Sequence, residues 1–361
     1  MSDLNIDVLT LDGWGQRVST FRFELLDRQL ESIGELEVDR SQPPTISNNV
    51  NNTIKRELSG LRFNPSGVNL LRDRVRVWMQ VLTADGLQEY PMGVFLFADV
   101  SEPITTGVDW IEGTLVDQGL ILDQANSRSV GYRPGTLITD CIKERIGGRM
   151  IPLYNVASSG AKVRGKEWLT WPAGTTDMEV VNDLCQLAGF YSVYFDNFGV
   201  AQAQPIPDLE AVDPDFSYAK GENVFMDSLT RTHDLLTAPN RYIVINNSMT
   251  ETSIAGRWDI PDSAPHSFQN RGIIVTKVID SQAVESSAEA RAMAKREGQA
   301  DTSVYEWITL SAPINPLHDT FNVVAFEGVP FHEQGWDAVL QDGADHKHNL
   351  RRIYREITDQ V

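Results

Sequence analysis

Residues 74–117 constrain the fold most, because apolar and polar side chains alternate along them with a period of two. Every second residue from Val75 to Val81 is apolar, and the residues between them are arginine, tryptophan or glutamine. This period is typical of a half-buried β-strand. Asp85 and Gly86 supply the positive φ of a tight hairpin, and two more strand-like runs follow at 94–100 and 110–116. We therefore predict a three-stranded meander.

The length and composition are those of an ordinary globular protein. A chain of 361 residues, 41% of them hydrophobic, can fill the cores of two or three domains. No run approaches the ~20 apolar residues of a membrane helix, and the N-terminus lacks the pattern of a signal peptide. Cys141 and Cys185 both lie in helical patterns. We expect buried thiols rather than a disulfide, as in a protein made in a reducing cytoplasm.

The formal charge is −19, from 31 basic and 50 acidic residues. So acidic a chain is not expected to have a large surface that grips nucleic acid by neutralising phosphates. The charge also favours solubility.

The first region, 1–120, is predicted to be one all-β domain. Strand-like runs at 5–11, 18–26 and 30–38 precede a segment rich in Pro, Asn, Ser and Thr at 41–53. Such a composition cannot bury enough apolar surface for a core, so we predict a mobile loop there. The strand pattern resumes at 54–63 and continues through the meander.

The middle region, 121–208, is predicted to be a small α+β domain. Apolar residues recur at helical spacing over 135–146. A second helix has a capping box of Thr176 and Glu179 at its start and Gly189 at its end. A hairpin with an Asp-Asn-Phe-Gly turn follows, and the region ends at the Pro-Ile-Pro-Asp segment 205–208.

The third region, 209–340, returns to a β pattern. Strands are predicted at 240–246, 273–279, 304–310 and 322–326, with a loop-rich insertion at 247–270. An Ala/Glu-rich helix is predicted to start at Ser286, with Glu289 completing a capping box. Residues 341–361 form a C-terminal tail with a basic run at 346–352. The fold class is therefore α+β, mainly β.

No short motif indicates catalysis or a cofactor. P-loop, dinucleotide, zincin, nucleophile-elbow and CxxC patterns are absent. The nearest approach to a P-loop is 160–166, where Glu167 replaces the hydroxyl residue that magnesium needs. The 50 acidic residues do not exclude a glycosidase pair, but choosing two of them would be arbitrary.

Four histidines occur in patterns that could support acid–base or metal chemistry. His233 and His318 each precede an aspartate, but adjacency does not orient a general base, so we expect structural or surface roles. His346 and His348 would share a face on a strand and could bind a metal there. Lys347 between them and the lack of a nearby third ligand favour an exposed tail instead. We predict no catalytic, cofactor-binding or metal-binding residue.

Two further groups have both a functional and a structural interpretation. Four aromatic residues could stack on sugars, although their spacing is more typical of core or rim packing: Trp168, Trp171, Tyr191 and Tyr194. Three arginines near the C-terminus could contact an acidic partner chain or form a solvated face: Arg351, Arg352 and Arg355.

Five segments occur in an order that resembles the tail-hub proteins of bacteriophages. RVRVWMQVL-TADG-LQEYPMGVFLFADVS with VDWIEGTLVD resembles their first tube-like domain, at Trp78, Gly93, Phe95, Gly113, Leu115 and Asp117. TTDMEVVNDLCQLAGFYSVYFDNFG resembles their inserted domain. PNRYIVIN, SSAEARAMAKREGQ and PLHDTFNVVAF resemble strands and the helix of their second tube-like domain. The likeness spans about 70–340, and the last segment lacks the Gly-Asp often found before that strand.

The resemblance implies a non-enzymatic virion protein with two tail-tube-like β-barrel or sandwich domains around an inserted α+β domain. Three chains would form a trimeric hub that adapts the sixfold tail tube to a threefold tip, between a tube or distal tail protein and a tip or fibre protein. The hub would be assembled in the host cytoplasm. DNA would pass through its lumen, which the −19 charge would keep repulsive to phosphates. The alternatives are a carbohydrate-binding adhesive β protein, or a hydrolase of cell-wall or capsule polymers.

Overall fold

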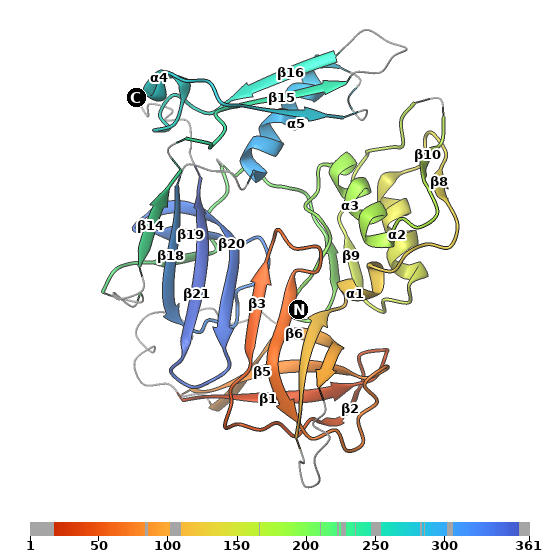
Figure 1. Cartoon of the computed structure of the whole chain (residues 1–361), viewed down its shortest axis with the longest axis vertical. Coiled ribbons are helices and arrows are strands. Elements are labelled where there is room, and N and C mark those ends of the chain that lie inside the picture. The colour runs from red at the N-terminus through yellow and green to blue at the C-terminus, as the bar shows by residue number, and fades with distance from the viewer. Residues whose placement is uncertain are drawn as a thin grey trace.

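The computed structural model describes most of the chain between residues 18 and 353 (Figure 1). The described part leaves out 84–85, 102–109, 166, 210, 222–223, 225–228, 235, 247–253, 282–283, 285 and 302–305. The predicted strand at 5–11 and Asp85 of the predicted turn lie outside it. Antiparallel sheets dominate, so the mainly β prediction is confirmed.

The described residues of the first region form seven strands of one large sheet. They are β1 (Ser19–Leu26), β2 (Ser32–Glu35), β3 (Thr45–Asn49), β4 (Arg56–Phe63), β5 (Arg74–Thr83), β6 (Gly86–Ser101) and β7 (Ile111–Asp117). The predicted meander is confirmed, because β5 pairs antiparallel with β6 and β6 with β7. The alternating residues from Val75 to Val81 are all buried in the core beneath it.

The segment 41–53, predicted to be a mobile loop, contains strand β3, so that prediction is wrong. β3 pairs with β4 on one side and on the other with β20 (Val329–Val339), which belongs to the third region. We call the β3–β20 pairing the seam. It joins the first region and part of the third region in one 13-stranded sheet of the described residues. The polar composition of β3 suits this place, because Asn48 is buried with its side chain hydrogen-bonded.

The middle region packs helices on short sheets. Its elements are α1 (Gly119–Leu122), β8 (Val130–Tyr132), α2 (Ile138–Gly148), β9 (Tyr154–Val156), β10 (Leu169–Trp171), α3 (Asp177–Ala188), β11 (Tyr194–Phe195) and β12 (Ala201–Ala203). Both predicted helices and the hairpin are confirmed. Thr176 and Glu179 form the complete capping box, and Gly189 ends α3 in the left-handed conformation. Cys141 and Cys185 are buried and free, as predicted.

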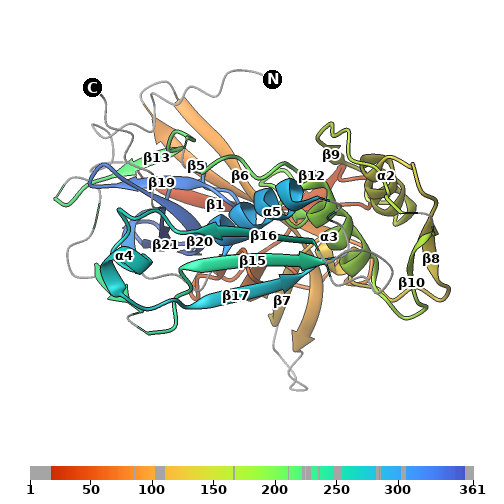
Figure 2. The ribbon, with the colours of Figure 1, turned by 90° about the horizontal axis from the view of Figure 1, so that it is seen from above.

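The third region has two parts. One belongs to the large sheet: β13 (Phe216–Tyr218), β14 (Thr230–His233), β18 (Glu306–Pro313), β19 (Val323–Phe326), β20 and β21 (Asp345–Arg352). The other has its own core and contains β15 (Arg241–Asn246), β16 (Ile254–Asp259), α4 (Phe268–Arg271), β17 (Thr276–Asp280) and α5 (Ser287–Ala300). Figure 2 shows α5 lying along β15 and β16. The insertion predicted to be loop-rich thus includes β16 and α4.

The basic run at 346–352 is not an exposed tail. It forms β21, which pairs antiparallel with both β18 and β20 and so lies inside the large sheet. His346 and His348 have no exposed surface, and Arg351 is 3% exposed. Among the described residues, no helix is long and apolar enough to span a membrane.

Candidate functional site

The loop 314–322, between β18 and β19, is where the three regions meet. We call this meeting point the joint, made by Asn48, Arg56, Asn197, Asp319 and Trp336. Two of its members lie on the strands of the seam, since Asn48 is in β3 and Trp336 is opposite it in β20.

Asn197 brings the middle region into the joint. Asn197 lies in the turn between β11 and β12. In this turn the Asp196 carboxylate accepts hydrogen bonds from the backbone N–H groups of Phe198 and Val200, each 2.9 Å long. This local turn projects Asn197 outward from its own domain. The Asn197 amide donates to the carbonyl oxygens of Pro316 (3.2 Å) and His318 (3.0 Å).

Arg56 connects the first region to the other two. Its side chain is 1% exposed, and its Nη1 donates to Asn197 Oδ1 over 2.6 Å. Its Nη2 forms an ion pair with Asp319. Its guanidinium lies 5.6 Å from the centre of the Trp336 ring, and such a cation–π contact adds stability where water is excluded. One arginine from β4 thus contacts the inserted hairpin, the 314–322 loop and β20.

Further contacts hold the loop against the seam. Asn48 donates to the Thr320 hydroxyl over 2.7 Å, and the Trp336 indole N–H donates to the Asp319 carbonyl over 3.0 Å. Phe321 has a positive φ of 66°, a conformation that costs free energy in a residue with a bulky side chain. Its ring stacks on Tyr191 with the centroids 4.0 Å apart. Charged, polar and aromatic contacts therefore fix the three regions relative to one another.

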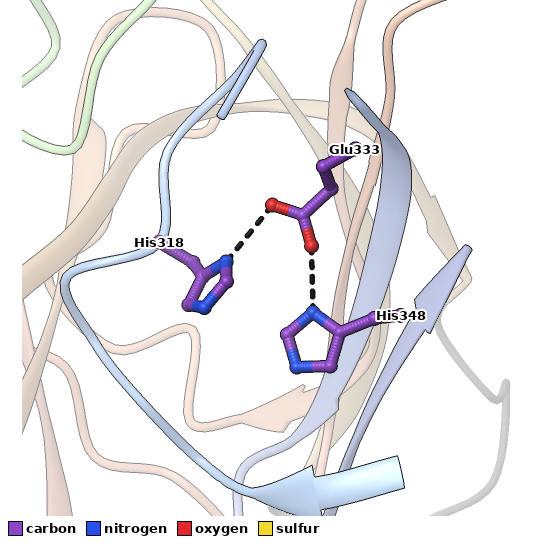
Figure 3. A group of neighbouring side chains, drawn as sticks. All are labelled: His318, Glu333 and His348. Carbon is purple, nitrogen blue, oxygen red and sulfur yellow. Dashed lines mark hydrogen bonds and ion pairs between the residues drawn. The ribbon is translucent and has the colours of Figure 1, made fainter. Parts of the chain in front are cut away.

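A second polar group lies in the core beside the joint (Figure 3). Glu333 of β20 bonds to two histidines, with 2.8 Å between Oε2 and Nδ1 of His318 and 2.6 Å between Oε1 and Nδ1 of His348. The Tyr218 hydroxyl is 2.8 Å from the other ring nitrogen of His318. The His346 ring lies 4.1 Å from that of His348. We call His318, Glu333 and His348 the His–Glu cluster.

A β-bulge explains why a glutamate faces the core here. The register of β20 against β21 shifts between Glu333 and Gly335, and an extra residue in one strand reverses which side chains point inward. Glu333 is therefore buried, as Trp336 and Ala338 are, although an unbroken alternation would have turned it to the other face.

The pKa values of the Glu333 carboxylate and of the His346 and His348 imidazoles are all lowered, but for different reasons. Burial raises the pKa of Glu333, but the charges and hydrogen bonds of His318 and His348 outweigh it and hold that pKa at about 2. Burial lowers the pKa of His346 well below the ordinary value, and that of His348 is also lowered by burial. The core here holds an ionised carboxylate among imidazole rings.

The histidine–aspartate neighbours of the sequence do not act as pairs. His318 bonds to Glu333, whereas Asp319 pairs with Arg56, so each has a separate partner. His233 is exposed on β14, and Asp234 caps a turn by accepting from the backbone N–H groups of Leu236 and Thr237.

The prediction that His346 and His348 are exposed is wrong, because β21 places both inside the sheet. Sequence reasoning also missed Glu333, which is 15 positions from both His318 and His348. The available signal for a strand was the period of two over 346–350, where His346, His348 and Leu350 alternate with Lys347 and Asn349.

The structure also shows where aromatic and arginine side chains of the two other predicted groups lie. Trp171 is buried and donates to Asp183 over 2.7 Å, and Tyr191 stacks on Phe321 of the 314–322 loop. Trp168 is exposed, with the Arg133 guanidinium 5.0 Å from its ring centre. Arg351 is buried and donates to the carbonyl oxygens of Gln299 and Asp301, so it does not belong to a solvated face. Arg355 and Lys166 lie outside the described residues.

Comparison with solved structures shows a shared fold. A tail protein from Neisseria meningitidis MC58 aligns with a TM-score of 0.62 and 11% identity, over 92% of this chain and 97% of that one. Prophage tail protein gp18 from Listeria monocytogenes EGD-e aligns with a TM-score of 0.58 and 10% identity, over 91% and 94%.

A third similar structure is the E. coli c3393 protein, with a TM-score of 0.51 and 8% identity over 92% of this chain and 77% of that one. It is described as a type VI secretion component with structural similarity to the T4 tail proteins gp27 and gp5. No family model and no curated protein matches the sequence. This chain has the fold of phage tail proteins, as its segment order predicted.

Proposed function

We propose that this chain is a structural protein of a phage-type tail, and more specifically a homotrimeric hub at the tail tip. The observation that carries the proposal is the seam: β3 and β20 join two β regions of one chain edge to edge. Two such regions in each of three chains would give a pseudo-sixfold ring, which suits a tail tube on one side and a threefold tip or fibre on the other. The shared fold with tail proteins supports this proposal.

The joint suits such a role because a ring closes only if its units have a fixed relative orientation. Arg56, Asn197 and Asp319 connect the three regions through short hydrogen bonds and an ion pair. Buried hydrogen bonds and ion pairs between distant segments favour one arrangement of the parts around them. In the proposed ring, the joint sets the angle between the two β regions and places the middle domain beside them.

The acidic composition suits a channel for DNA. With a formal charge of −19, a lumen lined by carboxylates would repel phosphates and let the genome pass without binding. A trimer structure with a neutral or basic lumen would contradict this part of the proposal. The role we propose is not enzymatic, and its place is the virion, after assembly in the host cytoplasm.

Light scattering and negative-stain imaging of the purified chain test the proposal. We expect a trimer and threefold rings with a central channel. A monomer that binds glycans on an array would instead support the carbohydrate-binding alternative. Turnover of a defined polysaccharide that carboxylate-to-amide variants abolish would support the hydrolase.

A further inference from the structure

The Glu333 carboxylate is a buried charge that lacks an ordinary counter-ion. The residue is 1% exposed, and its ion pairs are with His318 and His348. Within the described part of the chain, no lysine or arginine forms an ion pair with it. Buried charges in proteins are normally paired with an opposite charge or coordinate a metal.

The donor atoms of the His–Glu cluster are already close together. One ligand atom from each of the three residues lies within 4.8 Å of the others. The carboxylate oxygens are 2.6 and 2.8 Å from the two Nδ1 atoms. Two ligands that each lie ~2.1 Å from one zinc ion are ~3 Å apart or more. A small opening of the cluster would therefore admit one ion between the carboxylate and the two rings.

The two histidines of the cluster differ at Nε2. The Nε2 atom of His348 has no hydrogen-bond partner among the described residues, and a metal on Nδ1 would leave it so. The Nε2 of His318, by contrast, has the Tyr218 hydroxyl 2.8 Å away. An imidazole that binds a metal through Nδ1 keeps its proton on Nε2, so His318 would donate to Tyr218, the outer contact that metal-ligating histidines usually have.

We propose that Nδ1 of His318, Nδ1 of His348 and the two oxygens of Glu333 bind one divalent transition-metal ion. Two imidazole nitrogens and one carboxylate form a set of side chains that suits zinc. In each neutral imidazole the ring proton moves from Nδ1 to Nε2, so Nδ1 is free to bind the ion and no net proton is released. Since all three residues are buried, the ion has a structural role. It ties the 314–322 loop to β20 and β21, next to the joint.

This site revises the expectation that no residue of the chain binds metal. That expectation depended on the lack of a third ligand near His346 and His348 in the sequence. Glu333 from β20 and His318 from the 314–322 loop supply the missing donors only in the folded chain. Lys347, which argued against a site, alternates with the histidines and is exposed on the other face of β21.

Metal analysis of the full-length chain tests the proposal. After purification without chelators, we expect one equivalent of zinc per chain. After removal of metal with a chelator, added Zn²⁺ should raise the melting temperature. Co²⁺ in place of zinc should give visible d–d absorption, which reports direct ligation. A chain that binds less than about a tenth of an equivalent, and whose melting temperature responds to neither zinc nor chelator, overturns the proposal.

Variants separate ligation from simple loss of a buried side chain. Glu333→Gln and His348→Gln should lose bound zinc and the Co²⁺ spectrum. His266→Gln removes another buried histidine, in the third region and outside the cluster, and should retain both. Equal zinc content in all three variants contradicts the assignment. If the cluster variants do not fold, the Co²⁺ titration of the unaltered chain decides, and absence of the absorption rejects the site.

Discussion

Arg56 and Asn197 are 141 positions apart in the chain, and their side chains meet in a buried hydrogen bond of 2.6 Å. The arginine comes from a strand of the first region and the asparagine from a two-stranded hairpin of the middle region. The same asparagine donates to two carbonyl oxygens of the 314–322 loop. The pair therefore links the first region to the middle region, and Asn197 extends the link to the third.

Replacing Asn197 with alanine should destabilise the chain by about 3 kcal/mol. The change leaves Arg56 Nη1 and two buried carbonyl groups without the partners they have now, and each such loss costs ~1–3 kcal/mol before relaxation. Urea unfolding measures the effect. Asn155→Ala removes an exposed asparagine that bonds to Gln202 and should change stability by less than about 0.5 kcal/mol. If both substitutions lowered the free energy of unfolding equally, Asn197 would contribute no more stability than an exposed asparagine does.

The seam depends on a glycine at one position. A Cβ on Gly335 would lie 2.3 Å from the backbone carbonyl oxygen of Asn48 in the neighbouring strand. Gly335→Ala should therefore push β3 away from β20 and cost about 1–3 kcal/mol. Hydrogen exchange should show faster exchange at 45–49, and light scattering should show loss of the proposed trimer.

Gly148→Ala is the matched control for the seam. A Cβ on Gly148 meets nothing within 4 Å, and alanine suits the end of α2 better than glycine does. This variant should keep the exchange pattern of β3 and the oligomeric state. Unchanged protection at 45–49 in Gly335→Ala would refute the close-approach argument.

Thr176→Ala should remove the N-terminal cap of α3. The Thr176 hydroxyl accepts from the Glu179 backbone N–H over 3.1 Å, and the Glu179 carboxylate accepts from the Thr176 N–H over 2.8 Å. Loss of such a cap costs about 1 kcal/mol. Thermal or urea unfolding measures it, with Thr175→Ala as the neighbouring control. A control that loses as much stability as Thr176→Ala would exclude capping as the cause.

Stability should decrease in mild acid because of His266. Burial, with a smaller effect of the Arg271 charge, lowers the pKa of this histidine from 6.5 to about 4. The folded state binds the proton more weakly than the unfolded state, so the stabilisation is complete above pH 6.5. It is lost as the pH falls from 6.5 towards 4, up to about 3 kcal/mol.

Urea unfolding at pH 7 and at pH 4.5 checks this direction. His266→Gln should reduce the difference in stability between the two pH values, because glutamine does not titrate. His233→Gln replaces an exposed histidine on β14 and should leave the difference unchanged. A His266→Gln variant with the full acid sensitivity of the unaltered chain would contradict the assignment.

Local patterns were sufficient to predict many of the elements. The alternation over 74–81 predicted β5 and its buried face, and Thr176, Glu179 and Gly189 predicted both ends of α3. These signals are local, because a strand period or a cap is set by residues a few positions apart. The order of the segments was also sufficient to predict the tail-protein fold.

Only the tertiary structure decided where polar segments lie. The 41–53 segment has too little apolar surface to form a core alone, yet β3 is ordered between β4 and β20, and Asn48 reaches Thr320. The sequence alone predicted that His346 and His348 lie in an exposed tail. In the folded chain β21 pairs with β20, and Glu333 bonds to His348. Burying a polar group costs free energy unless a partner bonds to it. Periodicity and composition determine many of the helices and strands. The seam, the joint and the His–Glu cluster depend on contacts between residues that are distant in sequence.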